Sequence, residues 1–317
     1  MNAAIRAGLL FGLLSLTTSV LAQDDLSDLK DLEDEPSRTQ LFALVRAVAE
    51  AEDPPASDSQ RQEFSLVGPF GFPTDVLTDS STNQPRTDAI FGVDISHYTD
   101  SSFPISRLRD KRVRFVFVKA SQGTTNKDGK FAMFWKALGQ LPAEHRVHRG
   151  AYHFLSASSE GAAQAATFLR VLNANGGIVA RDMPPVVDLE WDNDRDGHDR
   201  WAGKTADEIV ASAKAWLQAV EQATGRKPMI YTAQAWWTPR LGDARLAEFA
   251  GYPIWIADYS KASRAAEVPR MMGNAVPAAW QFTDKAKMDQ GFTAGFDASV
   301  FKGSEEKFYE TFGIARP

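Results

Sequence analysis

The chain has 317 residues, 44% of them hydrophobic and 24% charged, which suits one large globular domain and excludes a chain disordered throughout. Its formal net charge of -6 gives no electrostatic reason to expect nucleic acid as a partner. The absence of cysteine excludes disulfides, thiolate metal sites and cysteine nucleophiles, and the five histidines lack a His-Glu-x-x-His spacing. We therefore expect neither a metal nor a cofactor.

The first 22 residues have the pattern of a secretory signal peptide. Arg6 precedes an apolar run over 7–21, and the small residue Ala22 follows it. The run contains serines and threonines and is too short to span a bilayer comfortably, which disfavours a membrane anchor. No other segment is long and apolar enough to cross a bilayer. We expect cleavage after Ala22, no stable membrane span afterwards, and a periplasmic or secreted protein.

Residues 23–87 differ in composition from the rest of the chain and predict a mostly extended acidic leader. It begins with a run of aspartates and glutamates over 24–35 and is rich in Pro, Ser and Thr. Apolar residues at helical spacing predict one short helix over 37–50, which either packs on the main domain or docks an unknown protein partner. The segment 64–79, with GPFGFP at 68–73, predicts an extended arm laid over the domain surface.

From residue 88 to 317, short apolar runs alternate with longer amphipathic stretches, which is typical of an α/β domain with repeated strand and helix units. No Gly-x-Gly-x-x-Gly follows the first strand, so a barrel is favoured over an open nucleotide-binding sheet. The predicted strands are 90–95, 113–120, 149–154, 185–190, 229–232, 254–257 and 279–282. The predicted helices are 130–141, 159–173, 205–224 and 241–250.

Two carboxylates end the apolar run PPVVDLEWD at 184–192. Alternate side chains of a strand point to the same face, so Asp188 and Glu190 should lie together. Crowding in a partly dry pocket would separate their pKa values, leaving one acid protonated and the other ionised, as glycosidic bond cleavage requires. The alternative is a strand end whose acids cap a helix or pair with Arg181 or Arg195.

The other predicted strands also end in acids and aromatic residues. Rings stack on the apolar faces of sugars while acids accept hydrogen bonds from hydroxyls, so these ends predict a carbohydrate site. The strand ends are DISHY (94–98), KASQG (119–123), AYHF (151–154), DLE (188–190), IYT (230–232), WIADY (255–259), WQF (280–282) and FD (296–297).

In this order the motifs resemble glycoside hydrolase family 25, the lysozymes or N-acetylmuramidases that cut the glycan of peptidoglycan. The resemblance runs from GVDISHY (92–98) through PPVVDLE (184–190) to FDASVF (296–301) and does not cover residues 1–87. It implies an irregular TIM-like β/α barrel. Departures at Gln122, Tyr98–Asp100 and Phe282 concern specificity rather than chemistry.

The resemblance also implies roles for residues. Glu190 resembles the general acid, and Asp188 the second carboxylate, acting either as nucleophile or by steadying attack by the substrate's own N-acetyl group. Asp94 and Asp297 resemble two further acids of the cleft. The candidates for sugar contact are Tyr152, Tyr231, Trp255, Tyr259 and Gln281.

Three functions are compatible with these residues. The leading hypothesis is a muramidase that cleaves the β-1,4 bond between N-acetylmuramic acid and N-acetylglucosamine with retention, with peptidoglycan glycan strands as its partner. The second is a hydrolase of another N-acetylated glycan such as chitin. The third is a non-catalytic cell-wall-binding protein on the same scaffold. Within this cleft, Lys119 is expected to neutralise Asp94 or Asp297, and His153 to be a core residue.

Overall fold

The computed structural model describes residues 25–32, 70–78, 83–259, 267–288, 292 and 294–316. The expected signal peptide and the expected helix over 37–50 lie outside these residues. Within them, no helix is both long and apolar enough to cross a membrane.

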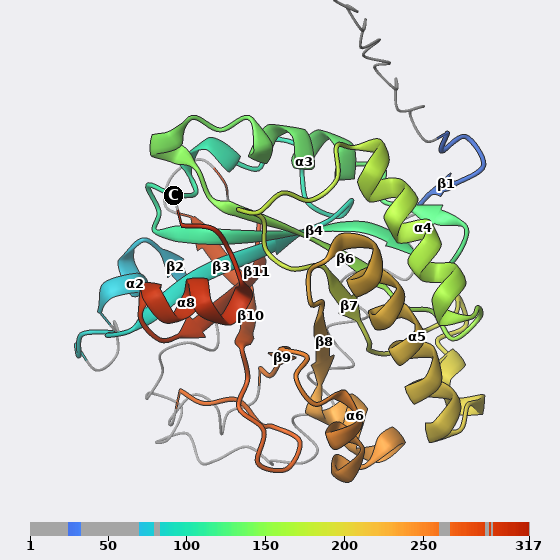
Figure 1. The fold of residues 1–317 in the computed structure, drawn as a ribbon. Helices are drawn as coiled ribbons and strands as arrows, with labels where there is room; N and C mark the ends of the chain where they lie inside the picture. The colour runs from blue at the N-terminus through green and yellow to red at the C-terminus, as the bar shows by residue number, and fades with distance from the viewer. Residues whose placement is uncertain are drawn as a thin grey trace, which may run out of the picture.

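Eight strands of the described residues close into a barrel (Figure 1). β4 pairs with both β3 and β6, and the order continues from β3 through β11, β10, β9, β8 and β7 back to β6. Neighbours pair in parallel except around β11, which runs antiparallel to β3 and β10. The strands are β3 (Ala89–Ile95), β4 (Val113–Gln122), β6 (His148–Phe154), β7 (Val186–Asp188), β8 (Met229–Ala233), β9 (Ile254–Ala257), β10 (Ala279–Met288) and β11 (Phe296–Lys302).

Helices cover part of the outer face of this barrel (Figure 1). α5 begins with a capping box, in which Thr205 accepts from the Glu208 amide while Glu208 accepts from the Thr205 amide, and it ends at Gly225 in the left-handed region. The helices are α2 (Thr74–Leu77), α3 (Phe131–Gly139), α4 (Gly161–Ala174), α5 (Ala206–Thr224), α6 (Gln234–Leu241) and α8 (Glu305–Phe312). Shorter 3-10 helices are η2 (Ile105–Arg107), η3 (Ala143–His145), η4 (Arg200–Gly203) and η5 (Asp243–Phe249).

The predicted strands and helices are present with shifted ends, with one correction. The helix expected over 241–250 is a 3-10 helix, η5, preceded by the unpredicted α6. Gly242 separates the two at φ +75°, a left-handed conformation that a continuous α-helix cannot contain. The C-terminal helix α8 was not predicted either.

The arm is also packed more deeply than expected. Of the segment 64–79, the described part forms β2 (Gly71–Phe72), which pairs with the end of β10, and then α2. Phe70 and Phe72 are buried among the rings of Phe91 and Phe282. Burial is favoured because it removes the apolar surface of both phenylalanines from water.

In the leader, residues 25–32 contact the barrel as well. β1 (Lys30–Asp31) pairs in parallel with β5 (Asn126–Lys127), a short strand that folds back on the end of β4. Leu29 is buried, so this part of the leader is docked rather than solvated.

Candidate active site

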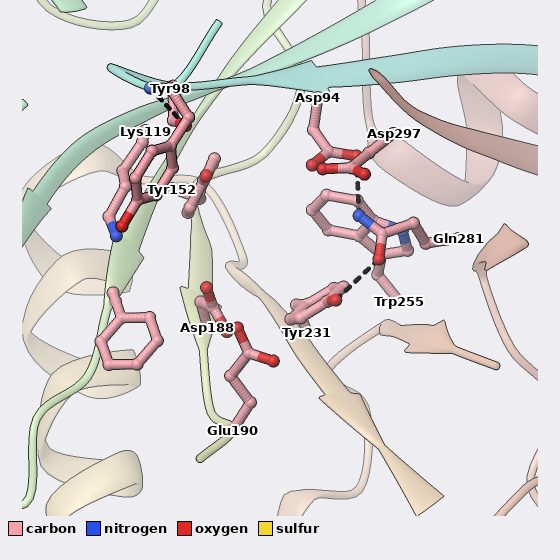
Figure 2. A pocket seen from close by; sticks show the side chains of 12 residues that line it. Asp94, Tyr98, Lys119, Tyr152, Asp188, Glu190, Tyr231, Trp255, Gln281 and Asp297 are labelled. Atoms are coloured by element: carbon pink, nitrogen blue, oxygen red, sulfur yellow. Dashed lines mark hydrogen bonds between the residues drawn. The ribbon is translucent and has the colours of Figure 1, made fainter. Parts of the chain in front are cut away.

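Four acids from distant parts of the chain line one pocket (Figure 2). Asp94 lies near the end of β3, Asp188 ends β7, and Glu190 follows two residues later. Asp297 is near the start of β11, and because β11 is antiparallel its start meets the end of β3, where Asp297 pairs with Asp94. The structure therefore brings together all four acids that the sequence singled out.

The pocket is open to solvent, and the space in and just above it that protein atoms do not fill is about 560 Å³. Of the predicted sugar contacts, Tyr152, Tyr231, Trp255 and Gln281 line it, and Tyr259 is not among its lining residues. Sequence reasoning missed three lining residues as site residues, although all lie in the strand-end motifs: Ser96, Tyr98 and Phe154. Lys119, which was expected in the cleft, lines it as well.

Strand β7 is shorter than predicted, because it ends at Asp188 rather than at Glu190. The Leu189 amide still donates to the Tyr231 carbonyl at 2.9 Å, so the chain keeps its direction beyond the strand. Glu190 thus reaches the same pocket as Asp188 from a bend after the strand.

Burial raises the pKa of both acids of this pair. For Asp188 the pKa lies well above its usual value, since burial penalises the ionised form and the Glu190 charge adds to the effect. Burial likewise raises the pKa of Glu190 to about 7, with Lys119 opposing the rise and Asp297 adding to it. Two such neighbours titrate as a pair, which favours a state with one shared proton near neutral pH.

Asp188 is 5% exposed, and its Oδ1 atom has no hydrogen-bond partner among the residues that the structure describes. A buried carboxylate oxygen without a partner loses its hydration without compensation. The atom is therefore an acceptor available to a donor group of a ligand in the pocket.

The alternative in which these acids pair with arginine is not what the structure shows. Within the described part of the chain, neither Asp188 nor Glu190 forms an ion pair with an arginine, and Arg181 donates to the Gly139 carbonyl at 3.3 Å. The acids face the pocket instead (Figure 2).

Lys119 differs from its prediction. Its Nζ donates to Gln122 Oε1 at 2.9 Å and lies 4.8 Å from the centre of the Phe154 ring. Burial lowers the pKa of Lys119, while the carboxylates that most oppose this are Asp188 and then Asp128, rather than Asp94 or Asp297. The charge of Lys119 therefore acts mainly on the side of the pocket where Asp188 lies.

Gln281 joins three groups that the sequence listed separately. The Tyr231 hydroxyl donates to Gln281 Oε1 at 2.7 Å, and Gln281 Nε2 donates to Asp94 Oδ2 at 2.8 Å (Figure 2). The Tyr259 hydroxyl donates to the same Gln281 Oε1. Two donors at the amide oxygen fix which end of the amide faces Asp94. Tyr259 therefore contacts Gln281 and does not line the pocket itself.

Trp255 and Tyr152 are two of the predicted aromatic residues that line the pocket. Trp255 stacks on Phe117 with ring centres 4.6 Å apart, and its Nε1 donates to Ser299 Oγ at 3.0 Å, so its position is fixed. Burial, with the surrounding carboxylates, raises the pKa of Tyr152 well above its usual value and keeps its hydroxyl neutral.

His153 is a core residue, as expected. Its Nδ1 lies 2.8 Å from Ser121 Oγ, its Nε2 lies 3.2 Å from Gln164 Oε1, and its ring stacks on Trp216. Burial lowers the pKa of His153 to about 3, so the ring is neutral at physiological pH. It does not line the pocket.

The acidic loop after β7 brings Asp194, Asp196 and His198 close enough for their side-chain atoms to share an ion. Asp194 Oδ1 already accepts hydrogen bonds from the amides of Asp196 and His198, which accounts for the loop geometry without a metal.

The fold and the pocket define a β/α barrel with an acid-lined cleft at the ends of its strands. Comparison with known proteins gives the family: the model of glycosyl hydrolases family 25 matches residues 93–290. The chain belongs to this family.

Relatives extend the comparison beyond the family model. An uncharacterised Escherichia coli O157:H7 protein, YegX, is 32% identical over 70% of this chain and 73% of its own length. Lysozyme M1 of Streptomyces globisporus is 28% identical over 69% of each chain. A solved bacterial lysozyme from Streptomyces coelicolor is 25% identical with a TM-score of 0.59, covering 72% of this chain and 99% of its own.

Proposed function

We propose that the protein is an N-acetylmuramidase that hydrolyses the β-1,4 bond between N-acetylmuramic acid and N-acetylglucosamine in peptidoglycan, with retention. The observation that carries the proposal is that the buried Asp188 and the partly buried Glu190 line one pocket, both with raised pKa values. Related chains named lysozyme or N,O-diacetylmuramidase support the choice of substrate.

Glu190 acts as the general acid. With its pKa at about 7 it holds a proton near neutral pH and gives it to the glycosidic oxygen as the bond to the anomeric carbon breaks. It then takes a proton from the water that completes hydrolysis. A carboxyl with an ordinary pKa would be ionised and could not donate.

Asp188 supports the opposite side of the same reaction. Its buried Oδ1 can accept the N–H of the substrate's acetamido group and orient that group for attack on the anomeric carbon. The same carboxylate can instead attack directly, and both routes retain the anomeric configuration.

The remaining lining residues bind and orient the sugar. Asp94, held by the Gln281 amide, and Asp297 accept hydrogen bonds from hydroxyls at the wall opposite the acid pair (Figure 2). Tyr152 and Trp255 supply fixed aromatic surface for the apolar faces of the rings.

Purified protein is expected to release reducing sugar from peptidoglycan, and Glu190→Gln to lower kcat by about 10²- to 10⁴-fold, as loss of a positioned general acid does. Glu144→Gln, an exposed glutamate in η3, is the matched control and should keep full activity. Full activity of Glu190→Gln would refute its role.

Products analysed by mass spectrometry separate the alternatives. Ends carrying N-acetylmuramic acid at the reducing side identify a muramidase, whereas turnover of chitin in preference to peptidoglycan identifies the second candidate. Binding of peptidoglycan without turnover by the wild type identifies a non-catalytic protein.

We also propose export to the periplasm or the cell exterior, where peptidoglycan is accessible. The support is the sequence pattern of residues 1–22. N-terminal sequencing of the secreted protein should find a chain beginning at Gln23.

A further inference from the structure

We propose that residues 25–32 help to shape the glycan cleft without lining it. By pairing with β5 they fix the position of Asp128, and Asp128 in turn holds the loop 96–99, which contributes Ser96 and Tyr98 to the cleft. This inference rests on the proposed function for its substrate. The segment lies outside residues 93–290, which the family model matches.

The segment is anchored along its whole described length. The Lys30 amide donates to the Thr125 carbonyl and the Leu32 amide to the Lys127 carbonyl, both at 2.9 Å. Leu29 is 7% exposed and belongs to the hydrophobic core. A solvated leader would leave this leucine in water.

Charged groups fix the same segment to α4 and β5. The guanidinium of Arg170 on α4 donates to both carboxylate oxygens of Asp28, at 2.6 and 3.1 Å, and also to the Asp25 carbonyl. The carboxylate of Asp31 pairs with Lys127. Figure 1 shows β1 beside α4, away from β2 and α2.

From β5 the contacts continue to the cleft. The Leu32 amide bond to the Lys127 carbonyl holds the residue directly before Asp128, and a Cβ added at the exposed Gly129 directly after it would lie 3.3 Å from the Asp31 carboxylate. Asp128 is itself buried, and its amide donates to the Ala120 carbonyl of β4 at 2.9 Å.

Asp128 then holds the loop after β3. Its Oδ2 accepts the His97 amide at 2.7 Å and lies 3.0 Å from His97 Nδ1, while its Oδ1 accepts the Lys130 amide at 2.9 Å. Lys130 Nζ donates to the Thr99 carbonyl at 2.7 Å. The loop clamped in this way carries Ser96 and Tyr98, which line the pocket.

Taken together, these contacts connect residues 25–32 to Ser96 and Tyr98, and none of them involves Asp188 or Glu190. Loosening the segment should therefore weaken glycan binding and leave the chemical step nearly intact. Asp128 is a positioning residue in this arrangement, because it acts through loop 96–99.

Leu29→Asp in the full chain tests the coupling by placing a charge in the buried site. We expect faster hydrogen exchange in peptides covering 25–32, 96–99 and 126–130. KM for peptidoglycan should rise by about three- to tenfold, a size usual for coupling through packed networks, with kcat changed less than about twofold. Leu77→Asp, at a 51% exposed leucine of α2, is the matched control and should change none of these.

A charge exchange gives a second test that does not disturb the core. Arg170→Glu should loosen the segment through repulsion by Asp28, and the double variant Asp28→Arg with Arg170→Glu should return exchange in 96–99 towards the wild-type rate. Failure of the double variant to restore exchange would contradict the proposed route.

The proposal is overturned if Leu29→Asp frees 25–32 while exchange in 96–99 and KM stay unchanged, or if 25–32 is unprotected in the wild type. Pelleting with insoluble peptidoglycan in a Glu190→Gln background measures binding without turnover. If no variant releases sugar but exchange and pelleting still respond to Leu29→Asp, the coupling stands and only the proposed hydrolysis fails.

Discussion

Placing the buried Asp188 and the partly buried Glu190 in one pocket costs folding free energy, because the ionised form of each carboxyl loses hydration there. The same burial gives Glu190 a proton to donate near neutral pH. For Glu190 the folded pKa is about 7 and the unfolded value 4.5, so the folded state holds the proton more tightly. This contribution to stability is fully present below pH 4.5 and is lost as pH rises through 7.

Glu190→Gln removes the ionisation and should therefore stabilise the protein increasingly as pH rises from 4.5 to 7, and by a constant amount above that. We expect a gain of about 3 kcal/mol in the free energy of unfolding at pH 8 and almost none at pH 4.5, because the pKa of Glu190 rises from 4.5 to about 7 on folding. Urea unfolding of wild type and variant at both pH values measures the difference. An equal difference at both pH values would show that burial does not penalise the Glu190 charge.

At the level of elements, the site depends on how closely α4 and α5 approach behind the sheet. Gly161 begins α4, and a Cβ there would lie 1.9 Å from the Ser212 carbonyl oxygen of α5. On the same helix, Gln164 contacts His153 and accepts the Ser156 amide at 2.8 Å. The helix pair thus supports β6, whose end supplies Tyr152 and Phe154 to the pocket.

Gly161→Ala should destabilise the protein by about 1 to 3 kcal/mol, since the overlap is with backbone and the helices must move apart. Gly203→Ala is the control, because a Cβ at Gly203 meets nothing within 4 Å. Thermal unfolding followed by circular dichroism compares them, and equal melting temperatures would mean that the helices can separate freely.

Local patterns predicted these elements unevenly. Seven of the eight barrel strands were predicted because each is a short apolar run with polar residues at its end, whereas β11 (Phe296–Lys302), which carries Asp297, was not. Helix α6 was missed because Pro239 and two adjacent tryptophans do not form a helical pattern. Trp236 and Trp237 are nevertheless buried, so tertiary packing stabilises this short helix. The two-residue strands β1, β2 and β5 carry no periodicity at all and exist through their pairing.

For the whole molecule, closure of the barrel depends on β11. It pairs with β3 on one side and β10 on the other, supplies Asp297, and lies beyond the residues that the family model matches. Phe296, Val300 and Phe301 of β11 are buried, as are Phe308 and Phe312 of α8.

A chain ending at Met288 should lose cooperative folding, because two strands lose a partner and a large apolar surface enters water. We expect no near-ultraviolet circular dichroism signal and a broad thermal transition. A chain ending at Ile314 lacks only the hydrogen bond from the Ala315 amide to the Ala180 carbonyl and the ion pair between Arg316 and Glu306. It should therefore unfold cooperatively. A sharp transition in the shorter chain would show that the barrel closes without β11.

The sequence by itself determined where seven of the eight barrel strands lie and that acids and aromatic residues follow them, because these features follow from local apolar patterns. It also placed Asp188 and Glu190 in one site, although Glu190 lies beyond the end of β7. Only the tertiary structure decided which distant groups meet. Gln281 donates to Asp94 across 187 residues, Lys119 balances Asp188 rather than Asp94 or Asp297, and residues 25–32 pair with β5. Such contacts depend on closure of the barrel, which joins residues whose separation along the chain carries no signal of their proximity.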